Sequence, residues 1–138
     1  YYNGEERRSR KIAKKLIQSL PIDNVQELVE VIKTCTPPKN RNRTIARVFQ
    51  AFRIALNDEL GKLSEFLSRY INYLDQGGKI VIISFHSLED RLVKMNFKDN
   101  NKNGLLNILT KKPIRASNDE VKINSRSKSA KLRCAEKI

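Results

Sequence analysis

The sequence predicts an α/β protein in which one apolar strand is packed among helices. The first observation is the stretch Gly77–Arg91, GGKIVIISFHSLEDR, where Ile80–Ile83 is β-branched and apolar on both faces, as in a buried strand of a parallel sheet. The second is the upstream spacing of apolar residues by three and four, which is typical of amphipathic helices. The third is the alternation of apolar and charged residues over Ala130–Ile138, which favours another strand.

The first 36 residues predict a small helical hairpin. A charged segment begins the first helix, whose apolar positions continue until Pro21 stops it. Asp23 and Asn24 are suitable caps for the second helix, which ends before Pro37. The basic segment 39–43 then predicts a loop, which is either a solvated connector or an arm that contacts phosphate.

A long helical pattern covers Thr44–Leu74, and Gly61 is expected to bend or split it. One face of this helix combines two arginines with two amides at spacings of three and four. That face is either an exposed polar surface or a set of contacts to phosphate and guanine edges. These residues are Arg47, Gln50, Arg53 and Asn57.

The apolar strand is followed at once by a polar turn and a new helix. Ser87 is predicted to cap that helix, with Asp90 at its third position. Because ligands of open α/β sheets bind beyond the carboxyl ends of the strands, we expect a polar cluster there, beside a helix N-terminus that favours negative charge. The residues at this point are Ser84, Phe85, His86 and Ser87.

The remaining chain predicts less regular structure. A short amphipathic helix is expected to end before the surface loop Lys98–Gly104, and Leu105–Thr110 is apolar enough for a strand. In the last segment, Leu132 and Cys134 share one face of an edge strand and Arg133 lies on the other. The two late strands are expected to pair antiparallel, and the missing parallel strands to come from upstream sequence.

The charge balance predicts a polyanionic partner. The chain carries 28 Lys and Arg against 15 Asp and Glu, a net charge of +13, which favours nucleic acid over a membrane surface. A soluble basic protein without such a partner is the alternative. No transmembrane or signal segment is predicted, and both cysteines are expected to be reduced thiols of a cytoplasmic protein without a metal site. The polar opening at Tyr1 suggests the later part of a longer chain.

Four stretches together resemble the RsmH/MraW family of S-adenosylmethionine-dependent bacterial 16S rRNA (cytosine-N4)-methyltransferases. Near the start, the segments GEER and SRKIA are similar to the family's GEERxSRRIA. The segment Arg47–Leu60, RVFQAFRIALNDEL, is similar to the family's TRTFQALRIxVNDEL. IISFHSLEDRLVK matches the family nearly letter for letter, and LTKKPI with SRSKSAKLRCAEKI resembles its C-terminal end. One departure is Arg43, which stands where the family usually has the His of a His-Pro-Ala-Thr segment.

The resemblance implies the C-terminal part of a class I (Rossmann-like) methyltransferase domain, over residues 44–138, after the later part of a helical insertion domain, over residues 1–43. The family's glycine-rich cofactor loop, acidic ribose-binding residue and DLGxSS motif are absent from this sequence. The S-adenosylmethionine site is therefore expected mostly upstream, in a missing N-terminal half, and this chain alone is expected to be inactive. The implied partner is 16S rRNA or the small ribosomal subunit, and a homodimer stays open.

The candidate residues divide into three groups, and none is assigned as catalytic. The strand-end residues Ser84 to Ser87 are candidates for shaping the pocket of the target base. Glu89, Asp90 and Arg91 are expected to fix the turn and the start of the helix. The candidates for RNA contact are Arg43, Arg47, Gln50, Arg53, Asn57, Lys111, Lys112, Arg126, Lys128, Lys131 and Arg133. The competing hypothesis is a non-catalytic RNA-binding or ribosome-assembly module.

Overall fold

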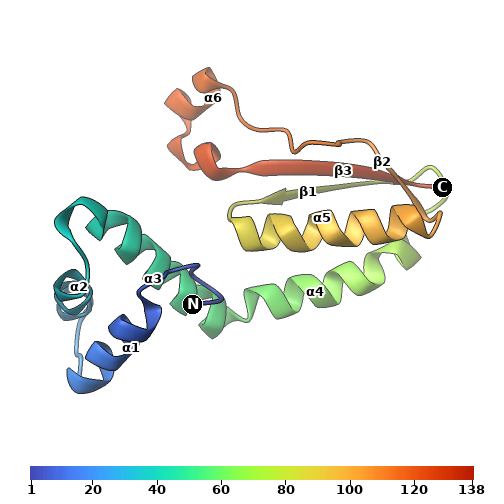
Figure 1. The fold of residues 1–138 in the computed structure, drawn as a ribbon. Coiled ribbons are helices and arrows are strands. Elements are labelled where there is room, and N and C mark those ends of the chain that lie inside the picture. The colour runs from blue at the N-terminus through green and yellow to red at the C-terminus, as the bar shows by residue number, and fades with distance from the viewer. The chain divides into compact units, whose positions relative to one another are not determined.

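The computed structural model describes all residues 1–138 and combines helices with a small sheet, as expected for an α/β protein (Figure 1). The chain forms two compact units, Tyr1–Glu59 and Leu60–Ile138, which are described separately. The compact units meet at Glu59 and Leu60, whereas the family resemblance implies a domain boundary between residues 43 and 44. That boundary refers to the domains of the longer family members and stays a prediction.

The first unit begins with the predicted helical hairpin. It contains α1 (Ser9–Gln18) and α2 (Val25–Thr34), and the Asn24 side chain caps α2 by accepting from the Glu27 N–H at 2.9 Å. The expected basic loop over 39–43 was wrong. That segment is helical, as η1 (Pro38–Asn40) followed by α3 (Arg41–Asn57), because Pro38 has a backbone angle suited to a first helical turn.

Apolar side chains from all three helices form the core of the first unit. Ile12 of α1, Ile32 of α2 and Val48 of α3 are buried, together with the free thiol of Cys35. The stripes of apolar residues read from the sequence therefore meet at one centre, which holds the three helices together.

The long helix is interrupted three residues earlier than expected. Asp58 adopts a left-handed conformation, with φ of 50° and ψ of 44°, and separates α3 from α4 (Glu59–Arg69). Asp tolerates this conformation better than most residues, so no glycine is needed at the break. Gly61, the predicted break point, lies inside α4, which is followed by the short helix η2 (Tyr70–Tyr73).

The second unit is built on a three-stranded sheet in the order β1-β3-β2. Strand β1 (Lys79–Ser84) and strand β2 (Leu106–Ile108) both pair antiparallel with β3 (Lys131–Lys137). The expected antiparallel pairing of the two late strands is confirmed. The prediction that the last strand is an edge strand was wrong, because β3 lies between the other two.

Only one face of β1 is buried within this chain. Ile80 is 8% exposed and faces the core, whereas Val81 and Ile83 are 55% and 54% exposed on the other face. The sequence predicted that β1 is buried on both faces in a parallel sheet. Within residues 1–138 this was wrong, because one face of β1 is exposed and its pairing strand, β3, is antiparallel. Parallel pairing with upstream strands stays a prediction.

Helix α5 (Ser87–Lys102) lies along the sheet, with α4 on the same side (Figure 1). Its buried residues Val93 and Phe97 contact the core residues of the strands and of α4. The expected loop over 98–104 is confirmed only for Asn103 and Gly104 and was wrong for residues 98–102, since α5 continues to Lys102. Asn101 stabilises this extension by donating from its amide to the Leu106 carbonyl at 2.7 Å.

The side chains of Tyr70 and Lys137 connect the region of η2 to the rest of the second unit. The Tyr70 hydroxyl donates to the Asn96 amide oxygen at 3.0 Å, and burial raises the pKa of Tyr70 to about 12. The Lys137 ammonium donates to the carbonyls of Ile71 and Leu74, at 3.0 and 2.7 Å. These bonds satisfy carbonyls that the end of a helix leaves without partners.

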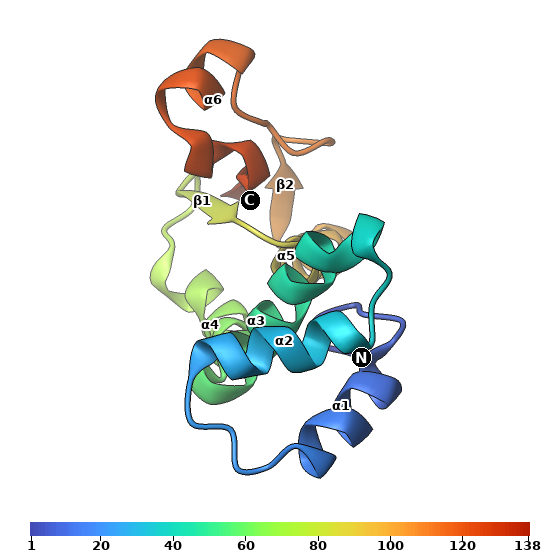
Figure 2. The ribbon, with the colours of Figure 1, turned by 90° about the vertical axis from the view of Figure 1, so that its left-hand side faces the viewer.

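Residues Arg115–Lys128 are polar and turn-rich in sequence, but the structure forms helix α6 (Asn118–Ile123) and the short helix η3 (Ser125–Ser129) there. Figures 1 and 2 show both at the end of the sheet where β1 ends, which agrees with the pairing of Ser84 with Lys131 directly after η3. None of the helices combines the length and apolar character that crossing a bilayer requires.

Gly4 is expected to be essential for the packing of the first unit. A Cβ at Gly4 would lie 2.5 Å from the Arg47 carbonyl oxygen and 3.1 Å from the Ala51 Cβ. Because both neighbours belong to helix α3, Gly4→Ala should lower the free energy of unfolding by about 1–3 kcal/mol, measured by urea denaturation. Gly61→Ala, at an exposed position inside α4, is the matched control and should raise it by about 1 kcal/mol. Equal effects of the two substitutions would contradict the packing argument.

Candidate functional site

The candidate site is the turn between β1 and α5. Two residues, Phe85 and His86, separate the end of β1 at Ser84 from the start of α5 at Ser87. Ser84 and His86 are buried, at 4% and 8% exposure, whereas Phe85 is 53% exposed and Ser87 is half-buried. The alternating pattern of the strand continues through the turn and directs the Phe85 ring to the surface. An exposed aromatic ring at a strand end is suited to stack on an unpaired base.

The helix cap differs from the predicted one by one residue. His86, not Ser87, is the N-cap of α5, and its Nδ1 accepts from the Glu89 N–H at 3.3 Å. In return the Glu89 carboxylate accepts from the N–H groups of His86 and Phe85, at 3.2 and 2.9 Å. This is a capping box in which an imidazole takes the part usually played by a hydroxyl.

The capping box changes what the helix N-terminus can bind. The sequence predicted a helix start that favours an anionic ligand, but the Glu89 carboxylate already occupies the two backbone N–H groups of the turn. An external anion at these two N–H groups would have to displace this carboxylate. The Phe85 ring is exposed at the same turn.

Asp90 connects the helix start to the central strand. Its carboxylate accepts from the Arg133 guanidinium at 2.7 Å and from the Lys131 ammonium at 3.3 Å. Burial raises the pKa of the Asp90 carboxyl, but the hydrogen bonds from the two cations outweigh burial and hold the pKa below its ordinary value. The three side chains are 8–18% exposed, so this ion-pair network is largely shielded from water.

Arg133 was placed on the wrong face of its strand. The sequence put it on the outer face of an edge strand, as a candidate for RNA contact, but it is 7% exposed and faces α5 beside Ala135. A central strand needs its polar residues paired, and Asp90 supplies that pairing. Lys131 has the same partner, so neither cation presents an unpaired charge to a phosphate.

The predicted polar face of α3 is also largely engaged within its own unit. Arg53 binds both oxygens of the Glu59 carboxylate, at 2.7 and 3.1 Å, and Asn57 donates to the same carboxylate at 3.4 Å. Gln50 donates to the Asn3 carbonyl, and Arg47 lies 3.7 Å from the Glu6 carboxylate. These contacts within the first unit give each of the four residues a structural role. RNA binding by the same residues stays a prediction.

Five of the candidate cations are exposed and have no ion-pair partner. Arg43 lies near the start of α3, Arg126 and Lys128 on η3, and Lys111 and Lys112 follow β2. The position of η3 brings Arg126 and Lys128 to the end of the sheet that carries the candidate site (Figures 1 and 2). These cations are the RNA-contact candidates that the structure leaves available.

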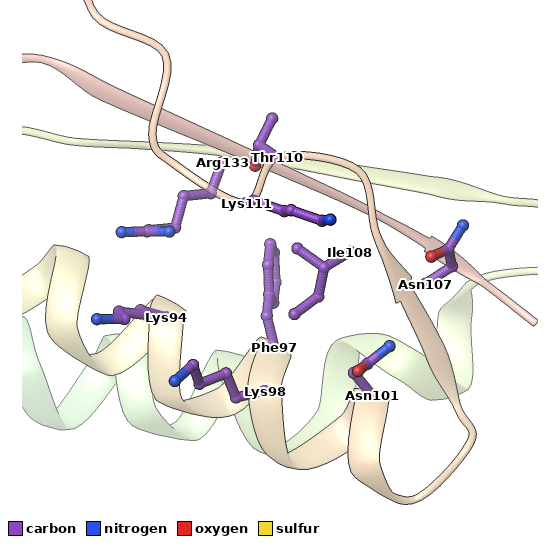
Figure 3. A pocket seen from close by; sticks show the side chains of 9 residues that line it. All are labelled: Lys94, Phe97, Lys98, Asn101, Asn107, Ile108, Thr110, Lys111 and Arg133. Atoms are coloured by element: carbon purple, nitrogen blue, oxygen red, sulfur yellow. The ribbon is translucent and has the colours of Figure 1, made fainter.

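Lys111 also lines a cavity of about 380 Å³ between α5 and the segment after β2. Figure 3 shows Lys94 and Lys98 on the helical side of this cavity, with the Phe97 ring and Ile108 between them and Lys111. The sequence analysis did not single out Lys94 and Lys98. Their spacing of four on a helix was the available signal, but only the extension of α5 through residue 102 places both on one continuous helix.

The whole chain, residues 1–138, matches the MraW methylase family. It is 53% identical over 140 residues to "Ribosomal RNA small subunit methyltransferase H" of Crocosphaera subtropica, covering 99% of this chain and 44% of that protein. Proteins of the same name from Trichodesmium erythraeum and Nostoc punctiforme are 51% and 50% identical, covering 100% and 98% of this chain but 49% and 45% of theirs. The chain therefore spans about half the length of the relatives it matches.

Asp90→Asn should destabilise the second unit at neutral pH. Because the substitution leaves Arg133 buried without its counter-charge, we expect a loss of about 2 kcal/mol in the free energy of unfolding, measured by urea denaturation. The Asp90 pKa is lowered in the folded state, so its stabilising contribution is present above the unfolded-state pKa of about 3.9 and is lost as the pH falls through the folded-state pKa.

The difference between wild type and Asp90→Asn should therefore be full at pH 7 and shrink under acidic conditions. The matched control is Asp119→Asn, which removes a carboxylate whose pair with Lys122 is 76–85% exposed. It should leave stability unchanged. A difference between wild type and Asp90→Asn that stayed constant down to the acid limit would show that the ion-pair network is not its source.

Proposed function

Because this chain belongs to the MraW methylase family, we propose that it is part of a methyltransferase that transfers a methyl group from S-adenosylmethionine to the exocyclic N4 of a cytidine in small-subunit (16S) rRNA. The observation that carries the proposal is the identity of about half of all residues to proteins named as small-subunit rRNA methyltransferases. A net charge of +13 supports a nucleic-acid substrate.

The cofactor does not fit a site formed by these residues alone. The glycines beside the sheet are Gly77 and Gly78 before β1 and Gly104 before β2, so none follows the carboxyl end of β1 at Ser84. At the carboxyl end, the Glu89 carboxylate already occupies the backbone N–H groups of Phe85 and His86. We therefore expect the main cofactor contacts to come from other parts of the longer protein, and this chain alone to be inactive.

In this proposal the turn after β1 holds the target base. An exocyclic amine of cytosine is a weak nucleophile, so the site must fix its orientation by stacking and by a hydrogen-bond acceptor. The base must also leave its helix to be reached. Phe85 is exposed and able to stack, and the capping box of His86 and Glu89 fixes the backbone on which its ring stands.

The alternative is a non-catalytic RNA-binding or ribosome-assembly module. The exposed, unpaired cations at residues 111, 112, 126 and 128 support it as well as they support an enzyme. Methyl transfer by the native protein that contains this chain separates the two hypotheses. With 16S rRNA as the substrate we place the protein in the cytoplasm, where small ribosomal subunits of bacteria are assembled.

His86 has two possible roles, and two substitutions distinguish them. In the native protein, His86→Ala removes the cap of α5 and should cost about 1 kcal/mol of stability, whereas His86→Asn keeps a capping side chain. If the imidazole also shapes the base pocket, both variants should methylate 16S rRNA more slowly, with cofactor affinity nearly unchanged. Turnover is measured per folded molecule, and thermal unfolding reports the cap. Full turnover by His86→Asn would limit the role of His86 to capping.

RNA affinity should depend steeply on salt because phosphate contacts release counterions. Lys111→Gln should make the slope of the logarithm of affinity against the logarithm of salt concentration shallower by about 0.7, the value for one single-stranded phosphate contact. Arg53→Gln is the control, since the Arg53 guanidinium is already bound to Glu59, and it should leave the slope unchanged. The measurement is a titration of labelled RNA at several salt concentrations. Affinity independent of salt would contradict phosphate binding altogether.

A further inference from the structure

The first unit contains a polar cavity of about 530 Å³ at the start of α3. Its walls come from two segments far apart in sequence, residues 6–8 before α1 and residues 40–47 at the beginning of α3. Four arginines line it, namely Arg7, Arg8, Arg43 and Arg47. Because all these residues belong to the first unit, the cavity is complete without any contribution from the second.

The lining of the cavity contains one carboxylate, that of Glu6, against four guanidinium groups. Glu6 is 4% exposed, and it accepts from the Arg8 backbone N–H at 2.9 Å and lies 3.7 Å from the Arg47 guanidinium. Arg7, Arg8 and Arg43 have no carboxylate partner for their side chains. The cavity therefore holds three unneutralised cations around a carboxylate that fixes the Arg8 backbone and lies beside Arg47.

This excess of positive charge is local, not a general property of arginines in the chain. Arg53, farther along α3, is neutralised by Glu59 in a two-pronged ion pair, and Arg133 in the second unit is neutralised by Asp90. Like charges that line one cavity repel each other and oppose folding, and a bound anion would relieve that repulsion. A cavity with four arginines and a single carboxylate is thus suited to an anionic ligand.

The residue types in the cavity favour phosphate over other anions. A guanidinium presents parallel N–H donors whose spacing matches two phosphate oxygens, and several arginines from two segments can contact one group from different sides. Asn40 and Thr44 add uncharged polar groups to the lining, and the cavity has no aromatic ring on which a base could stack. The expected contact is therefore to the backbone of a nucleic acid and not to its bases.

We propose that this arginine cavity binds a backbone phosphate of an RNA strand. The inference rests on the proposed function for the identity of the polyanion, and it adds Arg7 and Arg8 to the residues that contact it. A contact of this kind carries no sequence information and instead sets the position of the strand on the protein.

The test uses the native protein that contains this chain and a labelled oligouridylate RNA as the probe. A double variant that combines Arg7→Gln and Arg43→Gln removes two unpaired guanidinium groups at exposed positions. It leaves the contact between Glu6 and Arg47 in place. Affinity should fall by roughly tenfold or more, and the dependence on salt should become shallower. Arg43→Lys should retain part of the affinity, because it keeps the charge and loses the two-pronged donor geometry.

The matched control is Lys14→Gln with Lys15→Gln, which removes the same charge from exposed positions of α1 in the same unit. It should change affinity far less than the arginine pair. Equal losses in the two double variants would assign binding to the overall charge and overturn the cavity proposal, as would an unchanged affinity of the arginine variant. A probe with an uncharged peptide backbone should bind wild type and variants alike.

Failure of this inference is distinguishable from failure of the proposed function. Oligouridylate binding does not depend on methyl transfer, so a native protein without methyltransferase activity can still show the arginine dependence. In the opposite case, active methylation together with unchanged oligouridylate affinity in the arginine variant would overturn the cavity proposal alone.

Discussion

The second unit depends on the ion pairs that Asp90 forms with Lys131 and Arg133. They join the first turn of α5 to the central strand β3, across more than forty residues of sequence. A charged arginine on the buried face of a sheet is stable only beside a counter-charge, so Arg133 requires the helix start to stand where it does. The same constraint fixes the turn that exposes Phe85 and buries His86.

The structure divides the many cations of this chain into two classes. Arg53, Lys131 and Arg133 are held by carboxylates of their own unit and contribute to the fold. Others, including Arg43 and Lys111, lie exposed without such partners. Because a paired cation must give up its partner before it binds phosphate, the second class is the better source of RNA affinity. Net charge alone cannot make this distinction.

The polar residues of the candidate site are engaged in local structure. His86 and Glu89 form the capping box of α5, and Asp90 pairs with Arg133. These contacts hold the backbone that carries the exposed Phe85 ring. The relatives that this chain matches are about twice as long.

The sequence by itself determined the helical hairpin, the apolar strand β1, the antiparallel pairing of the late strands and the family, since these depend on local periodicity and contiguous motifs. It did not determine that β3 is central, that α3 ends at Asp58, or that His86 takes the capping position. Strand order and the pairing of Asp90 with Arg133 depend on contacts between distant residues, which no local pattern records. The arginine cavity is of the same kind, because residues 7 and 43 meet only after the hairpin packs on α3.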